Sequence, residues 1–463
     1  MGQDETFDLL VIGGGQGGIP LAHALAKKGM RVALAERKHL GGSCVNFGCS
    51  PTKAVIASAR VAQLARRGDE FGVAIGEVKP DFPRVLARAR DIVMQSRAGL
   101  RDGFRREGAP RLLEGHARFE GREGRAFVLR VGSRTVRARQ VVINTGTRSR
   151  IPPVPGLSKT SYINAESWLD HPELPAHLLV LGGGYTGLEM AQFYRRMGSR
   201  VTVVDDSPEI AGREDPEVAG ALRQFLESED IEFRLNARVE RVRREERGVQ
   251  ARLRQNGRGV RLDGSHLFLA AGRRPNTDDL GLETVHLKTS PDGFLEVNRR
   301  LATAVRGIWA AGDVRGGPMF THTSWDDHRV LLSQLAGDRS RTTDRVLAYA
   351  IYTDPQLGRV GLTEAEARKA RRDVRVARFE MSKNGKAREI GEPGGFIKVL
   401  ADRKSGRILG AAIVAVEAAE MVHIYVTLMN AKVPYRVVRD AVFIHPTLAE
   451  AVQGAAAALD EES

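Results

Sequence analysis

The sequence has little of several features that mark common protein classes. Its 463 residues include two cysteines and 6% aromatic residues, and no segment approaches the roughly 20 uninterrupted apolar residues of a membrane span. Two cysteines cannot form the disulfide framework of a small secreted protein. Lys and Arg outnumber Asp and Glu by 71 to 57, but no basic block dominates any segment. We therefore expect neither a dedicated nucleic-acid binder nor a membrane binder, and interpret the net charge of +14 as a solvated, Arg-rich surface.

The first residues also lack the marks of a targeting segment. Residues 1–8 are acidic rather than basic, and the first apolar run, residues 9–12, is much shorter than the core of a signal peptide. A cytoplasmic protein is the expectation. At roughly 150 residues per domain the length suggests about three domains, and an apolar content of 42% is enough to give each one a core.

What the chain does contain is an internal repeat. An apolar strand at residues 9–12 is followed by a glycine turn at 13–18, a helical pattern and a second strand that ends in Glu36. The same order recurs at 178–181 and 182–187, and its second strand ends in Asp205. In both copies the acidic residue stands 23 positions after the first glycine. The repeat predicts two dinucleotide-binding units.

The residue types of the repeat each have a physical reason. The first glycine permits a tight turn, the second lets the backbone approach a pyrophosphate, and the third lets helix and strand pack closely. These glycines are Gly13, Gly15 and Gly18 in the first copy, and Gly182, Gly184 and Gly187 in the second. The helix N-terminus supplies N–H donors to the phosphates, and Glu36 or Asp205 accepts from a ribose hydroxyl. One such turn could be an ordinary glycine-rich loop, but two copies in full context argue against that interpretation.

Both cysteines lie between the two turns. They occur in the segment GGSCVNFGCSPTK at residues 41–53, separated by four residues, ahead of a helical pattern over 54–66. A helix N-terminus favours the thiolate form of a cysteine. The alternatives are two inert core thiols or half of a metal site. A metal would need further Cys or His ligands nearby, and inert thiols have no reason to cluster.

This segment, placed between two dinucleotide turns, resembles the redox-active segment of the flavoprotein pyridine nucleotide-disulfide oxidoreductases, the family of glutathione reductase, dihydrolipoamide dehydrogenase and mercuric reductase. The resemblance runs almost end to end, with further matches in NTGT at 144–147, GRRPNT at 272–277, WAAGD at 309–313 and YTDP at 352–355. It implies an α/β enzyme with two Rossmann-like domains, which bind FAD and a nicotinamide nucleotide, and a C-terminal α+β dimerisation domain.

The resemblance also implies an order of domains, which the pattern of strands and helices supports. Residues 1–150 would begin the FAD-binding domain, 151–271 would form the nicotinamide domain, 272–345 would complete the FAD-binding domain, and 346–463 would form the interface of a homodimer.

The resemblance also implies roles for individual residues, which are assigned by their positions in the family's motifs. Lys53 would lie near the flavin and pair with Glu189, while Tyr185 would cover the nicotinamide site, although an aromatic residue in a first helical turn also has a plain packing interpretation. The expected cofactor contacts are Gly13, Gly15, Gly18, Glu36, Gly42, Ser43, Lys53, Gly115, Thr145, Gly146, Asp313 and Thr321, together with Gly182, Gly184, Tyr185, Gly187, Asp205 and Gly272.

The mechanism implied is a relay. Reduced nicotinamide passes hydride to the flavin, which reduces a disulfide between Cys44 and Cys49, with Cys49 as the thiolate against the flavin and Cys44 engaging substrate. A carboxylate at Asp205, with no arginine beside it, favours NADH over NADPH.

The C-terminal segment HPTLAE at 445–450 resembles the family's H-P-T-x-x-E. In that motif a histidine from the partner subunit, here His445, is the acid/base, and Glu450 orients it. The spacing from Thr447 to Glu450 is also that of a capping box for the last helix, and both interpretations can hold together.

The expected electron acceptor is a small disulfide or a thiol-bound metal ion. FTHTS at 320–324 and DPQLGRVG at 354–361 are similar to mercuric reductases, but those enzymes carry a vicinal cysteine pair near the C-terminus, and this chain has no cysteine after Cys49. The alternative enzyme is a dihydrolipoamide dehydrogenase acting on lipoyl groups. The alternative of another class is a flavin-bearing redox sensor. No resident metal is expected.

Overall fold

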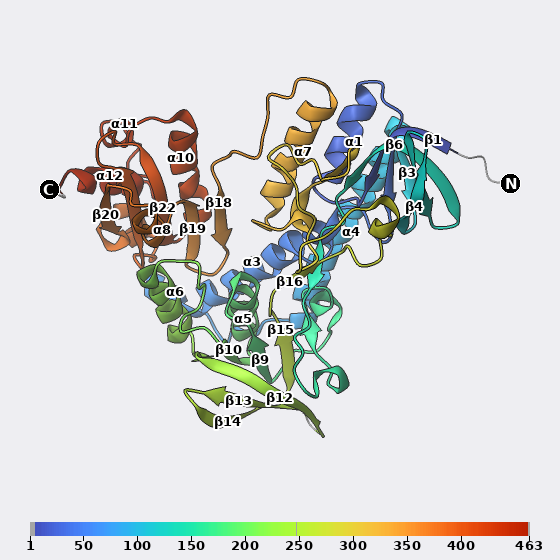
Figure 1. Ribbon diagram of the computed structural model, residues 1–463. Coiled ribbons are helices and arrows are strands. Elements are labelled where there is room, and N and C mark those ends of the chain that lie inside the picture. Colours follow the sequence, from blue (N-terminus) through green and yellow to red (C-terminus); the bar gives the residue numbers. More distant parts are fainter. Residues whose placement is uncertain (1–4, 247, 462–463) are drawn as a thin grey trace.

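The computed structural model describes residues 5–246 and 248–461 (Figure 1). The chain forms two regions built on parallel sheets and a C-terminal region built on an antiparallel sheet, so the predicted fold class is confirmed. In Figure 1 the C-terminal region, in red, lies apart from the N-terminal sheet, and the second parallel sheet lies below both. No described helix combines the length and apolar character that crossing a membrane requires.

The first region is an open sheet with its covering helices. In chain order, with η for a 3-10 helix, its elements are β1 (Glu5–Ile12), α1 (Gly18–Lys27), β2 (Val32–Glu36), α2 (Gly42–Asn46), α3 (Cys49–Arg66), η1 (Gly68–Phe71), α4 (Phe82–Glu107), β3 (Arg111–Glu114), β4 (Ala117–Glu123), β5 (Ala126–Val131), β6 (Arg134–Ile143) and β7 (Thr147–Ser149). The strand order is β3-β2-β1-β6-β5-β4. β1 is parallel to β2 and β6, and its residues 9–12 are buried against cores on both faces, which explains their uninterrupted apolar run.

The second region repeats this plan. Its elements are η2 (Leu157–Lys159), β8 (Ile163–Asn164), η3 (Trp168–Asp170), β9 (His177–Leu181), α5 (Tyr185–Met197), β10 (Arg200–Val204), α6 (Pro216–Ser228), β11 (Ile231–Arg234), β12 (Ala237–Glu245), β13 (Gly248–Gln255), β14 (Arg258–Gly264) and β15 (His266–Leu269). The parallel sheet has the order β11-β10-β9-β15-β8, and β12-β13-β14 form an antiparallel meander packed against it. β9 is central here as β1 is central in the first sheet.

The chain then returns to the first sheet. The returning elements are β16 (Arg273–Pro275), η4 (Leu282–Val285), β17 (Ile308–Ala310), η5 (Gly312–Arg315) and α7 (Thr321–Leu335). β16 pairs with β7, so the outgoing and returning segments run antiparallel side by side, and β17 adds a parallel strand beside β6. α7 packs with α1 on one face of the sheet (Figure 1).

The C-terminal region is an antiparallel sheet of order β18-β19-β22-β21-β20 with helices against it. Its elements are β18 (Ala348–Ile351), β19 (Gln356–Gly361), α8 (Glu364–Lys369), β20 (Val374–Glu380), η6 (Met381–Lys383), α9 (Gly385–Glu389), β21 (Phe396–Asp402), β22 (Ile408–Ala415), α10 (Ala418–Ala431), α11 (Arg436–Arg439) and α12 (Glu450–Glu461). The proposed boundaries near residues 150, 271 and 345 all fall between elements.

One hydrophobic core joins the first two regions. α3 and α4 pack against α5 of the second region, with Phe82, Trp168, Phe193 and Tyr194 at the contact. All four side chains are buried, and their rings lie 5.0 to 6.3 Å apart between centroids in each contacting pair. This shared core holds the N-terminal end of α3, which carries Cys49, against the helix that carries Glu189.

Candidate active site

The two cysteines are brought together by a tight turn between α2 and α3. Cys44 lies in α2, Cys49 is the first residue of α3, and both are free, half-buried thiols. The N–H groups of Phe47 and Gly48 both donate to the carbonyl of Ser43, at 3.1 and 2.7 Å. A Cβ at Gly48 would lie 2.9 Å from that oxygen, so a residue with a side chain would open the turn. The turn therefore brings together two thiols that are separated by four residues in the sequence.

The surroundings of Cys49 favour its thiolate. A hydrogen bond from the Cys44 thiol, with further help from Thr321 and the charge of Lys53, lowers the pKa of Cys49 to about 6 despite burial. The Oγ1 of Thr321 lies 3.0 Å from the Cys49 sulfur. The same hydrogen bond, together with burial, raises the pKa of Cys44. The pair is electrostatically asymmetric: one sulfur is a thiolate near neutral pH and the other remains a thiol.

Lys53 and Glu189 form the ion pair that the sequence predicts. The Nζ of Lys53 donates to Glu189 at 2.8 Å and lies 4.5 Å from the ring centre of Tyr352, whose backbone N–H donates to the other Glu189 oxygen at 2.9 Å. Burial acts to lower the pKa of Lys53, but the Glu189 carboxylate outweighs it, so the pKa is raised. A fixed positive charge thus stands one helical turn from Cys49.

His445 and Glu450 form a second pair, in the C-terminal region. The Nδ1 of His445 lies 3.0 Å from Glu450, and the other Glu450 oxygen accepts from the Thr447 N–H at 2.7 Å. The carboxylate therefore holds the imidazole and supplies the Glu450 half of the predicted capping box, whereas the Thr447 hydroxyl donates to the Ile444 carbonyl at 2.8 Å. The His445 side chain is 75% exposed, and among the described residues no hydrogen bond or ion pair joins it to either cysteine. Within one chain the histidine and the thiols are separate.

The first glycine turn has the shape that FAD requires. A Cβ at Gly18 would lie 2.1 Å from the Gly13 carbonyl oxygen, so α1 approaches β1 as closely as a glycine allows. A pocket opens beside the turn. It is lined by Gly13, Glu36, Arg37, Gly115, Thr145 and neighbouring residues. Gly42 packs against Gly15, since a Cβ at Gly42 would meet the Gly15 Cα at 2.9 Å. This narrow polar cradle fits the adenosine and pyrophosphate of the dinucleotide.

Two further groups around this turn point to a ligand. The buried Oδ1 of Asn144 has no hydrogen-bond partner among the described residues, while its amide donates to the Ala311 carbonyl at 2.7 Å. Asp313, in η5, accepts from the Thr147 hydroxyl at 2.9 Å. Gly146, which directly precedes Thr147, has a φ of 67°. Ser43 lies in the first turn of α2. Asn144 belongs to the NTGT motif at 144–147, in which the sequence assigns cofactor contacts only to Thr145 and Gly146.

The second glycine turn matches the first. A Cβ at Gly187 would lie 1.9 Å from the Gly182 carbonyl oxygen, and α5 begins at Tyr185, directly after Gly184. Asp205 stands at the end of β10 and accepts from the Gly183 N–H at 2.6 Å. Gly272 is not part of this turn: it precedes β16, and its carbonyl accepts from the Arg150 N–H. The turn and Asp205 thus have the geometry to hold a second dinucleotide.

Tyr185 belongs to an aromatic cluster that the sequence does not predict. Its ring stacks on those of Tyr349 and Phe320 with centroids 5.4 and 6.0 Å apart, and Phe320 immediately precedes Thr321. The Tyr349 hydroxyl donates to Glu214 at 2.5 Å, and Glu214 accepts from the buried Arg359 at 2.9 Å. Three distant segments therefore meet beside the second turn, and no periodic signal in the sequence links them.

Among the described residues, no group of three or more His, Cys, Asp or Glu side chains is arranged to hold a metal ion.

Comparisons with known proteins extend over the whole chain. A family model described as pyridine nucleotide-disulphide oxidoreductase matches residues 7–327, and the model of the corresponding dimerisation domain matches residues 347–456. The chain is 34% identical to a dihydrolipoyl dehydrogenase of Cupriavidus necator, over 99% of this chain and 98% of that protein. It is 32% identical to a probable pyridine nucleotide-disulfide oxidoreductase, RclA, of Escherichia coli, over 97% and 98%. The solved structure titled as the Cu(II) complex of the HOCl-induced flavoprotein disulfide reductase RclA from Escherichia coli superposes with a TM-score of 0.88 at 31% identity, covering 98% of this chain and 99% of that one.

Proposed function

This chain belongs to the pyridine nucleotide-disulphide oxidoreductase family, and from that premise we propose a homodimeric enzyme that carries electrons from NADH through FAD and the Cys44–Cys49 pair to a small disulfide or a thiol-bound metal ion. Membership makes it an NAD(P)H-dependent flavoprotein disulfide oxidoreductase with a dimerisation domain. The acceptor, the choice of nicotinamide and the residue roles are the proposal.

The observation that carries the proposal is the setting of the two thiols, in which the Thr321 hydroxyl lies 3.0 Å from the Cys49 sulfur and Lys53, paired with Glu189, stands one helical turn away. A pKa of about 6 keeps Cys49 ionised at neutral pH, while the raised pKa of Cys44 keeps that group protonated. A thiol–disulfide relay needs this division, because one sulfur must hold charge while the other exchanges with substrate. Two inert core thiols would not require one ionised and one protonated sulfur.

Bound FAD supplies two-electron transfer between nicotinamide and disulfide. The chain's own residues prepare the site for that chemistry. Lys53, held by Glu189, presents a fixed positive charge one turn from Cys49, and Thr321 provides a hydroxyl at the Cys49 sulfur. Cys44, after losing its proton, is the sulfur proposed to attack a disulfide acceptor. The acceptor's S–S bond breaks, its second sulfur leaves as a thiol, and a mixed disulfide with Cys44 forms. Attack by the Cys49 thiolate on Cys44 then releases the first acceptor sulfur as a thiol and re-forms the Cys44–Cys49 disulfide.

The acid/base that accepts and returns the proton in this thiol–disulfide exchange is proposed to be His445 of the partner subunit. The imidazole is exposed on its own chain and already oriented by Glu450, and the family match includes a dimerisation domain. A histidine suits this role because it titrates near neutral pH. The neighbouring Val442 and Ile444 are 100% and 80% exposed, as expected of side chains that a partner subunit would cover.

Two classes of electron acceptor are candidates. Disulfide reduction is favoured by the retained His445–Glu450 pair, and lipoyl groups are the acceptor implied by the curated relatives named dihydrolipoyl dehydrogenase. Reduction of a thiol-bound metal ion, mercuric or cupric, is the second candidate, supported by the similar RclA structure titled as a Cu(II) complex. The absence of any cysteine after Cys49 weighs against efficient handling of mercury.

The test is anaerobic turnover of the purified FAD-loaded protein with NADH or NADPH against three acceptors: lipoamide, oxidised glutathione, and Cu(II) or Hg(II) buffered by excess thiol. Cys49→Ser should abolish turnover with all three while leaving a quinone, which takes electrons from the flavin directly, as an active acceptor. A Cys49→Ser enzyme with normal disulfide or metal turnover would refute the relay. Nicotinamide-dependent turnover with none of the acceptors would favour the redox-sensor alternative.

The proposed domains are residues 1–150 and 272–345 for binding FAD, 151–271 for binding the nicotinamide nucleotide, and 346–463 for the dimer interface. The proposed location is the cytoplasm.

A further inference from the structure

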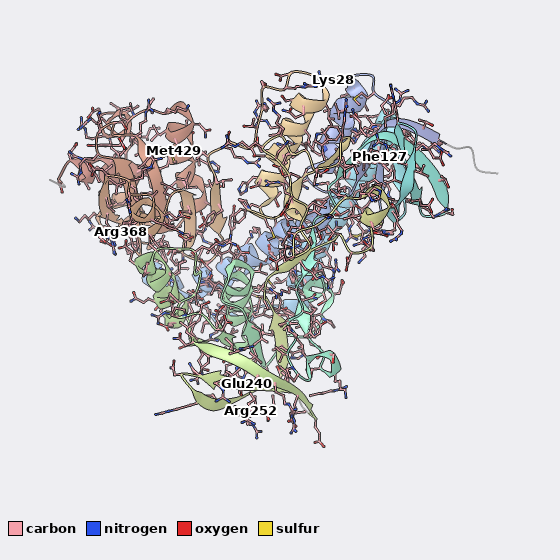
Figure 2. All side chains as sticks on the ribbon, in the orientation of Figure 1. Lys28, Phe127, Glu240, Arg252, Arg368 and Met429 are labelled. Carbon is pink, nitrogen blue, oxygen red and sulfur yellow. The ribbon has the colours of Figure 1, made fainter. Side chains whose placement is uncertain are left out.

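The outward face of the meander is dominated by arginine. Along β13 the side chains alternate, with Ala251 and Leu253 buried and Arg252 and Arg254 exposed. The buried set packs on the parallel sheet of the second region. We call the exposed arginines on this side of the meander the arginine face, and its members are Arg238, Arg241, Arg243, Arg252, Arg254 and Arg261. Figure 2 labels Arg252 and Glu240 at the end of the molecule formed by this meander, away from the labelled Lys28, Phe127 and Met429.

The strand register lines up three of these arginines. Arg241 lies directly opposite Arg252, and Arg252 lies directly opposite Arg261, so a row of like charges crosses all three strands. Arg238 lies opposite Arg254 in the next row. Directly opposed residues of an antiparallel sheet have Cβ atoms about 5 Å apart, and like charges there are destabilising. In the isolated protein the directly opposed arginines of this face therefore repel one another.

The face is only partly neutralised. Glu240 accepts from Arg254 at 2.5 Å and lies 3.9 Å from Arg252, and Asp263 lies 3.2 Å from Arg261. The part of the chain that the structure describes offers no ion pair to Arg241 or Arg238. The side chains of Arg252 and Arg261 are 67% and 68% exposed. Six arginines against three carboxylates, Glu240, Glu245 and Asp263, leave a positive surface that a partner could neutralise.

We infer that the arginine face is a docking surface for an acidic protein domain. Arginine suits this role because its planar guanidinium is weakly hydrated and donates two parallel hydrogen bonds to a carboxylate. Arginine is also enriched at protein interfaces. The surface belongs to the nicotinamide-side region and shares no residue with the cysteine site or with either glycine turn, so the inference goes beyond the proposed reaction.

A protein partner is favoured over a nucleic acid by two features of the face. None of its outward side chains is aromatic, so it has no platform on which a base could stack. Glu240 and Asp263 stand among the arginines, where they would repel phosphates but could pair with scattered Lys or Arg of an acidic domain.

The test measures binding of poly-L-glutamate to the FAD-loaded enzyme at low ionic strength. The variant R241Q/R252Q/R261Q should bind at least tenfold more weakly, and wild-type binding should weaken steeply with added salt. The control variant R105Q/R139Q/R299Q loses the same charge from three separated, exposed positions and should change affinity less than threefold. Equal weakening in both variants, or no binding by the wild type, would overturn the inference.

Two further arms separate the remaining explanations. A DNA duplex offered in place of polyglutamate should bind more weakly, and a duplex that binds more tightly and loses that binding in R241Q/R252Q/R261Q would replace the protein partner by a nucleic acid. Arg252→Gln alone should raise the melting temperature at low salt, with a smaller gain at high salt, because it removes the central charge of the row. An unchanged or lowered melting temperature would remove the argument from unfavourable charge. Unchanged NADH turnover in every variant checks that the fold is intact.

Discussion

Glu36 and Asp205 each hold two backbone N–H groups besides any ribose contact. Glu36 accepts from Gly14 and Lys38, both at 2.8 Å, and Asp205 accepts from Gly183 at 2.6 Å and Ser207 at 2.8 Å. The strand-end carboxylate therefore braces the middle of its glycine turn in both copies. This explains on structural grounds why the acid and the turn occur together.

Asp205→Arg should shift the enzyme from NADH toward NADPH. Losing a charge-assisted hydrogen bond of about 2 kcal/mol should raise the KM for NADH by roughly tenfold or more, while the guanidinium offers a partner for the 2′-phosphate. The measurement is the ratio of kcat/KM for the two nucleotides. Asp206→Arg makes the same charge change one residue along and should leave the ratio nearly unaltered. An unaltered ratio in Asp205→Arg would show that this carboxylate does not contact the ribose.

The acidity of Cys49 makes a second prediction at this scale. In the reduced protein the thiolate fraction rises as the pH passes through about 6, so alkylation of Cys49 by iodoacetamide should accelerate over that range. Thr321→Val removes one hydrogen bond to the thiolate and should move this midpoint upward by about 1 unit. The midpoint is measured by mass spectrometry of the alkylated peptide. Thr323→Val, a buried hydroxyl on the same helix with no partner among the described residues, is the control, and an equal shift there would contradict the assignment.

Helices and strands of different regions are joined by a buried charged contact. Glu214 and Asp215 precede α6 in the second region, and Arg359 lies in β19 of the C-terminal region. The Arg359 side chain is 1% exposed and pairs with Glu214 at 2.7 Å. The Tyr185 ring stacks on Tyr349, whose hydroxyl donates to the same carboxylate. Elements that flank the nicotinamide turn are thus tied to the proposed dimer interface.

Arg359→Met should destabilise the protein strongly. Removing Arg359 leaves the buried Glu214 carboxylate without its counter-charge, although the Tyr349 hydroxyl still donates to it, and this costs about 3–5 kcal/mol in the free energy of unfolding. The double variant Arg359→Met, Glu214→Gln should recover much of this loss, because no unpaired charge remains. Urea unfolding of the FAD-loaded proteins measures both values. A single variant as stable as the wild type would mean that Glu214 becomes hydrated or protonated at little cost.

At the scale of the whole molecule, the proposed catalytic histidine and the cysteines are separate on one chain. The structure places His445 in the C-terminal region, exposed, and the cysteines at the junction of the first two regions. The proposed site is therefore complete only when a second subunit supplies its histidine.

Mixing two inactive variants should restore disulfide turnover. His445→Ala keeps its cysteines and Cys44→Ser keeps its histidine, so each mixed dimer contains one complete site. Equal amounts, unfolded and refolded together, should reach about a quarter of wild-type activity, since half the dimers are mixed and half their sites are intact. Refolding each variant alone is the control. No recovery despite demonstrated mixed dimers would place the histidine and the thiols in the same subunit.

The glycine turns, their acidic partners and the cysteine segment could all be found in the sequence because each is a local pattern. A turn, a helix start and a strand end are set by residues within about one element of each other, and spacing alone records them. The pairing of Lys53 with Glu189 came from family resemblance, and the structure brings these side chains to 2.8 Å. The roles of all these residues stay predictions until tested.

The sequence by itself determined the two parallel-sheet units with their dinucleotide turns and the position of the paired cysteines, because local periodicity and short motifs encode them. Only the tertiary structure placed the groups that favour the Cys49 thiolate, which are the Cys44 thiol, the Thr321 hydroxyl 272 positions away and the Lys53 ammonium held by Glu189. Tertiary structure also decided that Tyr185, Phe320 and Tyr349 meet, that Arg359 is buried against Glu214, and that Arg241, Arg252 and Arg261 form one row. These features depend on strand register and on packing between regions, and both are settled by the free energy of the whole fold rather than by any local stretch of residues.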